Sequence, residues 1–228
     1  MNSPTDTLDQ SHIPILRRAG WALIAVGLLD IGFMIYCIVN RMNYSSSLNI
    51  FAVVVGVLLV RGHLPTARFV TSATAFLLSG LAVGCLTVYP WVMPWKYTWL
   101  TFRSDPAGWA VSVAFFFAIT LMLVWVYRQL RLPAVVAALA AKGHRSRAPI
   151  VAFVSGAALA ILMGVLVQLV LNGDTAREAI GRARQQHGTE YDYFVSNINW
   201  GAGRARATVV GYNEREVRDI EVEWQTTE

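Results

Sequence analysis

One carboxylate lies inside a stretch of sequence that is otherwise apolar. Asp30 falls near the middle of VGLLDIGFMIYC, residues 26–37. Ionisable groups inside membrane spans are costly, and they often mark proton relays or ion sites. A relay or a cation site also needs a second polar group at the same depth. The intramembrane polar candidates are therefore Asp30, Tyr36, Ser79 and Gln168.

A structural role for Asp30 is the alternative reading. At comparable depth the other apolar segments offer hydroxyl groups, such as those of Ser79 and Ser155, but no ionisable side chain. A lone carboxylate there would be protonated, because desolvation disfavours its charged form. It would then donate a hydrogen bond to a neighbouring helix. The sequence leaves both readings open.

Small residues recur every four positions in the last apolar segment. Helices approach closely where such residues align, and a glutamine on the same line adds interhelical hydrogen bonding. We expect packing inside one bundle, with a homodimer seam as the alternative. The helix-packing residues are Ala152, Gly156, Ala160 and Gly164, with Gly80 and Gly84 as a similar pair in the third segment.

The sequence contains no recognisable catalytic or metal-binding constellation. Cys37 and Cys85 are expected at similar depth as small apolar residues, and a disulfide between them stays open. The four histidines do not pair at a metal-ligand spacing. There is no nucleophile elbow, Walker loop or dinucleotide fingerprint. We therefore expect neither enzyme activity nor a cofactor or metal.

The composition is typical of a membrane protein. Of the 228 residues, 55% are apolar and 14% are charged, against about 25% charged in a typical soluble domain. Residues 1–173 hold 12 Lys and Arg against 4 Asp and Glu, whereas residues 174–228 hold 7 against 10. The basic excess lies in the connections between apolar segments, where membrane topology is decided. This placement argues against a nucleic-acid partner and for a lipid bilayer.

Five stretches approach the ~20 apolar residues that a bilayer core requires. They lie near residues 20–40, 44–60, 69–89, 109–127 and 148–171. Five such runs predict an all-α transmembrane bundle over residues 17–172, preceded by a disordered cytoplasmic tail over residues 1–16. The first run is expected to remain as a signal anchor, because no small-residue cleavage site follows it closely.

The second stretch is short, and the charges around it indicate that it crosses. With five crossings and the N-terminus inside, the cytoplasmic connections hold nine Lys and Arg, and the opposite short loops hold three. This distribution obeys the positive-inside rule, which would fail if the second stretch did not cross. The nine are Arg17, Arg18, Arg61, Arg68, Arg128, Arg131, Lys142, Arg145 and Arg147, and the three are Arg41, Lys96 and Arg103.

Two connections have recognisable features. Residues 89–102, YPWVMPWKYTWLTF, hold three Trp and two Tyr, and such rings settle at the headgroup level. We interpret this segment as interfacial, on the outer face. Asp105 suits a helix N-cap and Pro106 the first helical position, so the fourth span is expected to start there. Residues 133–142 predict a short helix against the cytoplasmic surface.

Residues 173–228 predict a separate extracytoplasmic α-β-β-β domain. Alanines at helical spacing indicate one helix that ends near Gly188. Three strand-like runs follow at residues 191–200, 205–212 and 217–224, and their period-two alternation predicts an antiparallel sheet with one buried face. A domain this small is marginal alone. We expect it to dock on the outer loops, to dimerise, or to bind a partner along a strand edge.

The segments LDIGFMIYC and YSSSLNIFAV carry a resemblance. From about Arg17 to Leu132, the chain resembles a family of uncharacterised bacterial inner-membrane proteins. The resemblance implies an inner-membrane location and transfers no activity. The tail is similar in layout to small cystatin-like domains, including those of cytochrome oxidase assembly factors. That similarity is one of architecture and does not establish function.

The sequence therefore predicts a non-catalytic, multi-pass protein of the bacterial inner membrane with its C-terminus outside. Its small periplasmic domain, residues 173–228, would bind a protein partner or a second copy of the chain in envelope or complex assembly. The alternative is a small proton-coupled transporter or channel that uses Asp30.

Overall fold

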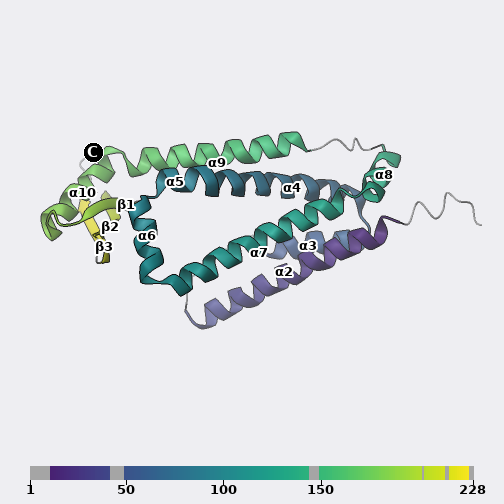
Figure 1. The fold of residues 1–228 in the computed structure, drawn as a ribbon, viewed down its shortest axis with the longest axis horizontal. Helices are drawn as coiled ribbons and strands as arrows, with labels where there is room; N and C mark the ends of the chain where they lie inside the picture. The colour runs from purple at the N-terminus through teal and green to yellow at the C-terminus, as the bar shows by residue number, and fades with distance from the viewer. Residues whose placement is uncertain (1–10, 42–48, 144–148, 202, 214–215, 226–228) are drawn as a thin grey trace, which may run out of the picture. The chain divides into compact units, whose positions relative to one another are not determined.

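The computed structural model describes residues 11–41, 49–143, 149–201, 203–213 and 216–225. The described chain is mostly helical and ends in a three-stranded antiparallel sheet (Figure 1). The chain forms two compact units: unit 1 comprises residues 1–79 and 118–156, and unit 2 comprises residues 80–117 and 157–228. The helices are α2 (Ile13–Val39), α3 (Asn49–Val60), α4 (Leu64–Val83), the π-helix η1 (Gly84–Val88), α5 (Tyr89–Val92), α6 (Trp95–Ser104), α7 (Pro106–Leu130), α8 (Pro133–Ala141), α9 (Ile150–Leu171) and α10 (Asp174–His187). The strands are β1 (Asp192–Gly201), β2 (Arg204–Tyr212) and β3 (Val217–Gln225).

Four helical segments in the described residues are long and apolar enough to cross a membrane. They are Ile13–Val39, Leu64–Val92, Pro106–Leu130 and Ile150–Leu171. Of the fifth expected span, the structure describes residues 49–60, which form α3, a helix of 12 residues that is about 18 Å long. Residues 44–48 of that predicted span lie outside the described residues. The structure thus confirms four of the five expected long apolar helices.

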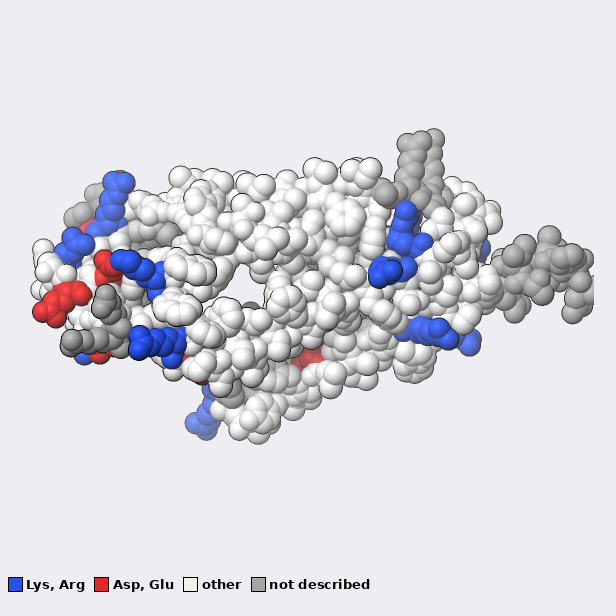
Figure 2. All heavy atoms as spheres, viewed as in Figure 1, with Lys and Arg blue, Asp and Glu red and all other residues white. Residues whose placement is uncertain are grey.

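The long helices expose most of their apolar surface. In the most apolar 18-residue stretch of each long helix, only 11–22% is buried. Large side chains such as those of Leu29 and Val151 are exposed. On the face drawn in Figure 2, charged side chains gather at helix ends and over the C-terminal domain, and the long helices are almost free of them. Soluble proteins rarely expose apolar patches of this extent, so the pattern is typical of helices surrounded by lipid.

Two helices extend beyond the bounds that the sequence predicts, and each extension has a local cause. The expected boundary between tail and bundle at residue 16 falls inside α2, which starts at Ile13 because Pro14 suits a first helical turn and Leu16 is fully buried. The third span runs on to Val92, past Pro90, through the π-helix η1. Proline removes one backbone N–H donor, and a π-helical turn is one way to absorb that change.

Two glycines hold α2 and α3 together as an antiparallel hairpin. A Cβ atom on Gly20 would lie 2.6 Å from the Gly56 carbonyl oxygen, and one on Gly56 would lie 2.7 Å from the Gly20 carbonyl oxygen. The same contacts bring Gly20 against Val60 and Gly56 against Ile24. Only residues without a side chain permit backbones this close.

The packed core of unit 1 lies where α2 and α4 begin and where α3 and α7 end. The short helix α8 also packs into this core, through Val135 and Leu139. Exposed arginines such as Arg17, Arg61 and Arg128 flank these buried positions in the sequence. The buried cluster consists of Leu16, Ala19, Val55, Leu59, Leu64, Ala67, Val70, Val126, Leu130, Val135 and Leu139.

In unit 2, α9 runs parallel to the end of the Leu64–Val92 segment. Gly164 abuts the Val88 side chain, and the Gln168 side-chain amide donates a hydrogen bond to the Trp91 carbonyl oxygen at 2.7 Å. From Val88 to Trp91 the residue number increases along one segment, and from Gly164 to Gln168 it increases along the other. The two segments therefore run in the same direction.

The C-terminal domain, α10 through β3, is one helix packed on a meander sheet. The strand order is β1-β2-β3, both pairs antiparallel. Ala176, Ala179 and Ala183 of α10 cover the sheet face that carries Val209 and Val222. Small alanines let the helix lie close to the strands. Gly188 ends α10 with a φ of +84°, a conformation that suits glycine. The α-β-β-β prediction is confirmed for the described residues.

Candidate functional site

Asp30 lies on the less exposed face of α2. Asp30 is half-buried. It lies at helical spacing from four buried residues of α2, which are Gly20, Ile24, Gly27 and Cys37. Burial that recurs every three to four residues marks one face of a helix. The carboxylate is therefore not placed on the fully lipid-exposed side of α2.

The α2–α3 register puts Asp30 at a particular depth. Gly20 contacts Gly56 and Val60, and Gly56 contacts Gly20 and Ile24. In an antiparallel pair, those contacts bring the amino-terminal end of α3 about level with Asp30. The first N–H groups of a helix have no partner within the helix and favour acidic groups nearby. This position supports the structural reading of Asp30.

The other polar candidates do not join Asp30 in one face or network. Tyr36 is 58% exposed and stacks on Phe33 with a centroid separation of 6.4 Å, so it lies on the outward face of α2. The Ser79 hydroxyl donates to the Phe76 carbonyl oxygen in its own helix at 3.0 Å. The Gln168 amide is bound to α5 as described above. The side chains of Ser79 and Gln168 thus donate hydrogen bonds to backbone carbonyl oxygens.

The small-residue line of α9 faces the Leu64–Val92 segment. Gly156 is buried against the Phe76 carbonyl and the Ser79 hydroxyl, and Gly164 against Val88. Ala152 and Ala160 are half-buried on the same line. Gly80 is half-buried in the partner helix, whereas a Cβ on Gly84 would meet no atom within 4 Å. The contacts at Gly156 and Gly164 are those of packing within the chain.

The cysteines and acidic residues form no metal centre in the described chain. Cys37 and Cys85 are free thiols, the first buried and the second exposed. No group of three His, Cys, Asp or Glu among the described residues lies close enough to hold a metal ion.

The second face of the sheet packs against α6. The Tyr97 ring lies 4.9 Å from the Phe194 ring and 6.1 Å from the Tyr212 ring, both in edge-on geometry. Phe194 pairs in register with Val210, which is buried on this face. Aromatic rings at these separations and angles attract one another. The C-terminal domain therefore packs on α6, which belongs to the connection between the Leu64–Val92 and Pro106–Leu130 helices.

A cleft of about 560 Å³ lies beside this contact, between α6 and the near end of the sheet. Lys96 and Arg103 project from α6, Glu190 lies two residues before β1, and Asp192 is the first residue of β1. One ion pair spans it, from Lys96 Nζ to Asp192 Oδ2 at 3.6 Å. The cleft is lined by Lys96, Trp99, Leu100, Arg103, Thr189, Glu190, Tyr191, Asp192, Tyr212 and Asn213.

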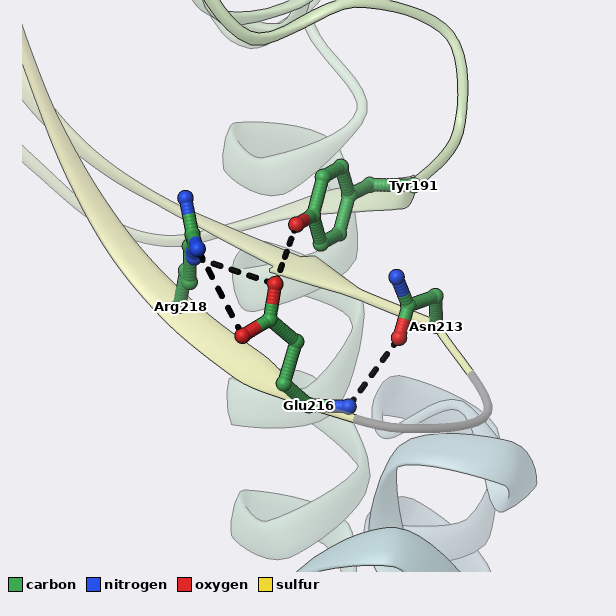
Figure 3. A network of polar contacts seen from close by, with 4 residues as sticks. All are labelled: Tyr191, Asn213, Glu216 and Arg218. Atoms are coloured by element: carbon green, nitrogen blue, oxygen red, sulfur yellow. Dashed lines mark hydrogen bonds and ion pairs between the residues drawn. The ribbon is translucent and has the colours of Figure 1, made fainter.

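Figure 3 shows a polar network of Tyr191, Asn213, Glu216 and Arg218, and two of these residues, Tyr191 and Asn213, line the cleft. The Tyr191 hydroxyl donates a hydrogen bond to Glu216, and Arg218 Nε lies 3.2 Å from Glu216 Oε1. The Glu216 backbone N–H donates to Asn213 Oδ1 at 3.0 Å, which closes the β2–β3 turn. The network ties Tyr191, the residue before β1, to that turn, so it holds two lining residues of the cleft, Tyr191 and Asn213, in place.

The network shifts the ionisation of its members. The hydrogen bond from Tyr191 lowers the pKa of Glu216, and burial opposes this effect. The same hydrogen bond raises the pKa of Tyr191. Burial raises the pKa of Tyr212 on the adjoining face, with a further increase from the charge of Asp192. Near neutral pH the network therefore contains a carboxylate and a neutral phenol.

The sequence did not identify the residues of this cleft. No pattern in the sequence distinguishes Glu216, yet it is the acceptor at the centre of the network. Lys96 and Arg103 were assigned only to an outer loop. A usable signal was the aromatic density of residues 89–102, which marked the segment as interfacial.

Comparison of the chain with protein-family models, with curated proteins and with solved structures finds no match. The resemblance to bacterial inner-membrane proteins therefore stays a prediction.

Proposed function

We propose that this chain is a non-catalytic integral membrane protein of the bacterial inner membrane. Its helices would hold the C-terminal domain at the outer surface, where the domain binds another protein or a second copy of the chain during envelope or complex assembly. The four long apolar helices support membrane insertion.

Helix directions support five crossings with the termini on opposite sides. In unit 1 the ends of α3 and α7 and the starts of α2 and α4 share one buried core. In unit 2, α9 runs parallel to the end of the Leu64–Val92 segment. Although α3 is short, the chain between Val39 and Val60 returns to the end where α2 began. The flanking arginines favour the cytosol for that end.

The contact of α6 with the sheet through Tyr97 lies at the end that carries Phe194 and Tyr212, and the observation that carries the proposal comes from the opposite end. That end bears Trp200, which is 57% exposed, next to the ion pairs Arg204–Glu223 and Arg206–Glu221. Both β1 and β3 are edge strands. Exposed tryptophan with nearby arginine is the composition that protein interfaces use as anchors, and a free edge can accept a partner strand.

Photo-crosslinking in intact cells tests this proposal. A photoreactive amino acid replaces Trp200 in the full chain, and the matched control carries it at Gln185, an exposed position of α10. We expect a discrete protein adduct at position 200 that is absent at position 185, with mass spectrometry identifying a partner or the chain itself. Equal labelling at both positions, or none at position 200, would contradict the proposal.

A further inference from the structure

The cleft between α6 and the sheet contains opposite charges on opposite walls. The cations Lys96 and Arg103 come from α6, and the carboxylates of Glu190 and Asp192 come from the strand side. Arg103 and Glu190 are exposed and make no hydrogen bond or ion pair within the described residues. The Lys96–Asp192 pair is 3.6 Å long with side chains 80% and 62% exposed, and such pairs are weak. The charged groups are therefore available to a ligand.

The positions around α6 define three separate faces. Trp95, Trp99 and Phe102 recur at helical spacing and are all exposed. Lys96 and Arg103 are seven residues apart, so they lie within about 20° of one another and about 90° from that aromatic stripe. Tyr97 lies about 100° further round and contacts the sheet. The two cations thus lie on α6 between the aromatic stripe and the face that contacts the C-terminal domain.

An aromatic stripe of this kind settles at the level of the lipid headgroups. A ligand that reaches the cleft from the lipid side would present its headgroup there. The cleft also falls within the 300–1,000 Å³ range common for small-ligand sites. Its two pairs of charges sum to zero, so a ligand with both a phosphate and an ammonium group complements it better than an anion does.

We propose that this cleft binds the headgroup of a zwitterionic phospholipid with a primary ammonium, with the phosphate on Lys96 and Arg103 and the ammonium on Glu190 and Asp192. Arginine presents a fork of N–H donors that matches phosphate oxygens. A primary ammonium can donate hydrogen bonds to carboxylates, and a trimethylated one cannot. The inference rests on the proposed membrane insertion and does not depend on a protein partner.

Native mass spectrometry of the detergent-purified full chain tests the proposal. The protein is offered phosphatidylethanolamine, phosphatidylcholine and phosphatidylglycerol in equal amounts, and the retained lipids are counted. We expect phosphatidylethanolamine to be retained about tenfold over each of the others, the difference that one charge-assisted hydrogen bond supplies. Equal retention of the three lipids, or a preference for phosphatidylglycerol, would overturn the proposal.

Variants distinguish the cleft from other lipid-contacting surfaces. Arg103→Gln and Glu190→Gln should each lower phosphatidylethanolamine retention to the level of phosphatidylcholine. Arg177→Gln is the matched control, because Arg177 is an exposed cation of α10 that pairs with Asp174 outside the cleft. Unchanged retention in Arg103→Gln and Glu190→Gln proteins with wild-type circular dichroism would contradict the assignment.

A soluble ligand with the same two groups is the competing occupant. Millimolar phosphoethanolamine, which lacks acyl chains, should leave the retained lipid in place. If it displaces the lipid completely, the site recognises a free zwitterion and the lipid assignment is wrong. A chain that stays soluble without detergent would instead refute the membrane insertion on which both proposals depend.

Discussion

At the scale of single residues, the partners of Glu216 determine how the C-terminal domain responds to acid. The folded state lowers the pKa of this carboxyl, chiefly through the hydrogen bond from Tyr191. Its ionised form is therefore more stable in the folded chain than in the unfolded chain. The resulting stability is present above the ordinary pKa of 4.5 and is lost as the pH falls through the lowered value.

Replacing Tyr191 with phenylalanine should move the titration of Glu216 upward. The variant keeps the ring but removes the hydroxyl donor, so the pKa of Glu216 should return toward 4.5. Carbon-13 NMR of the full chain labelled at glutamate carboxyls, with and without Tyr191→Phe, follows this titration. An identical Glu216 midpoint in both proteins would show that the Tyr191 hydroxyl does not stabilise the carboxylate.

Asp30 should tolerate asparagine better than leucine. Because Asp30 lies about level with the amino end of α3, an acceptor there can serve N–H groups that lack helical partners. Asparagine keeps an acceptor, whereas leucine removes it at a cost of about 0.5–2 kcal/mol, by analogy with helix caps. Thermal unfolding in one detergent measures this order. Loss of a transport phenotype in Asp30→Asn at wild-type protein level and stability would instead favour the transporter alternative.

At the scale of the elements, the α2–α3 hairpin depends on the contact between Gly20 and Gly56. Gly56→Ala would place a Cβ 2.7 Å from the Gly20 carbonyl oxygen, so the helices would have to separate, at a cost of about 1–3 kcal/mol. Gly32→Ala on α2 is the control, since nothing lies within 4 Å of its Cβ and alanine favours helix by about 1 kcal/mol. A melting temperature of the Gly56→Ala protein that equals or exceeds that of the Gly32→Ala protein would disprove the close contact.

Local signals in the sequence predicted the elements that rest on local chemistry. Asp105 accepts a hydrogen bond from the Gly108 N–H at 2.9 Å at the start of α7, as its residue type and the following proline indicated. Strand alternation and the glycine after α10 likewise predicted the C-terminal domain. Each of these signals is contained within one turn or one strand.

Contacts between distant segments could not be predicted in the same way. Tyr97 meets Phe194 and Tyr212, and Tyr191 meets Glu216, across separations that periodicity cannot connect. The cleft could not be predicted for the same reason, because its lining residues come from α6 and from segments that begin about 90 positions later in the chain.

At the scale of the whole molecule, two features have to hold together. In the proposed arrangement, lipid surrounds the exposed apolar faces of the long helices, and the arginine-flanked core of unit 1 lies at the cytoplasmic end. An odd number of crossings then separates that end from the C-terminal domain. The proposed partner surface at Trp200 is accessible from outside the cell membrane only under this arrangement.

Cysteine labelling in intact spheroplasts tests that arrangement most directly. In a chain with Cys37→Ala and Cys85→Ala, single cysteines replace Asn199 on β1 and Arg68 on α4, both exposed. A membrane-impermeant maleimide should label position 199 at once and position 68 only after the membrane is permeabilised. Labelling of position 199 that requires permeabilisation, or equal labelling of both positions in intact spheroplasts, would contradict five crossings with the C-terminal domain outside.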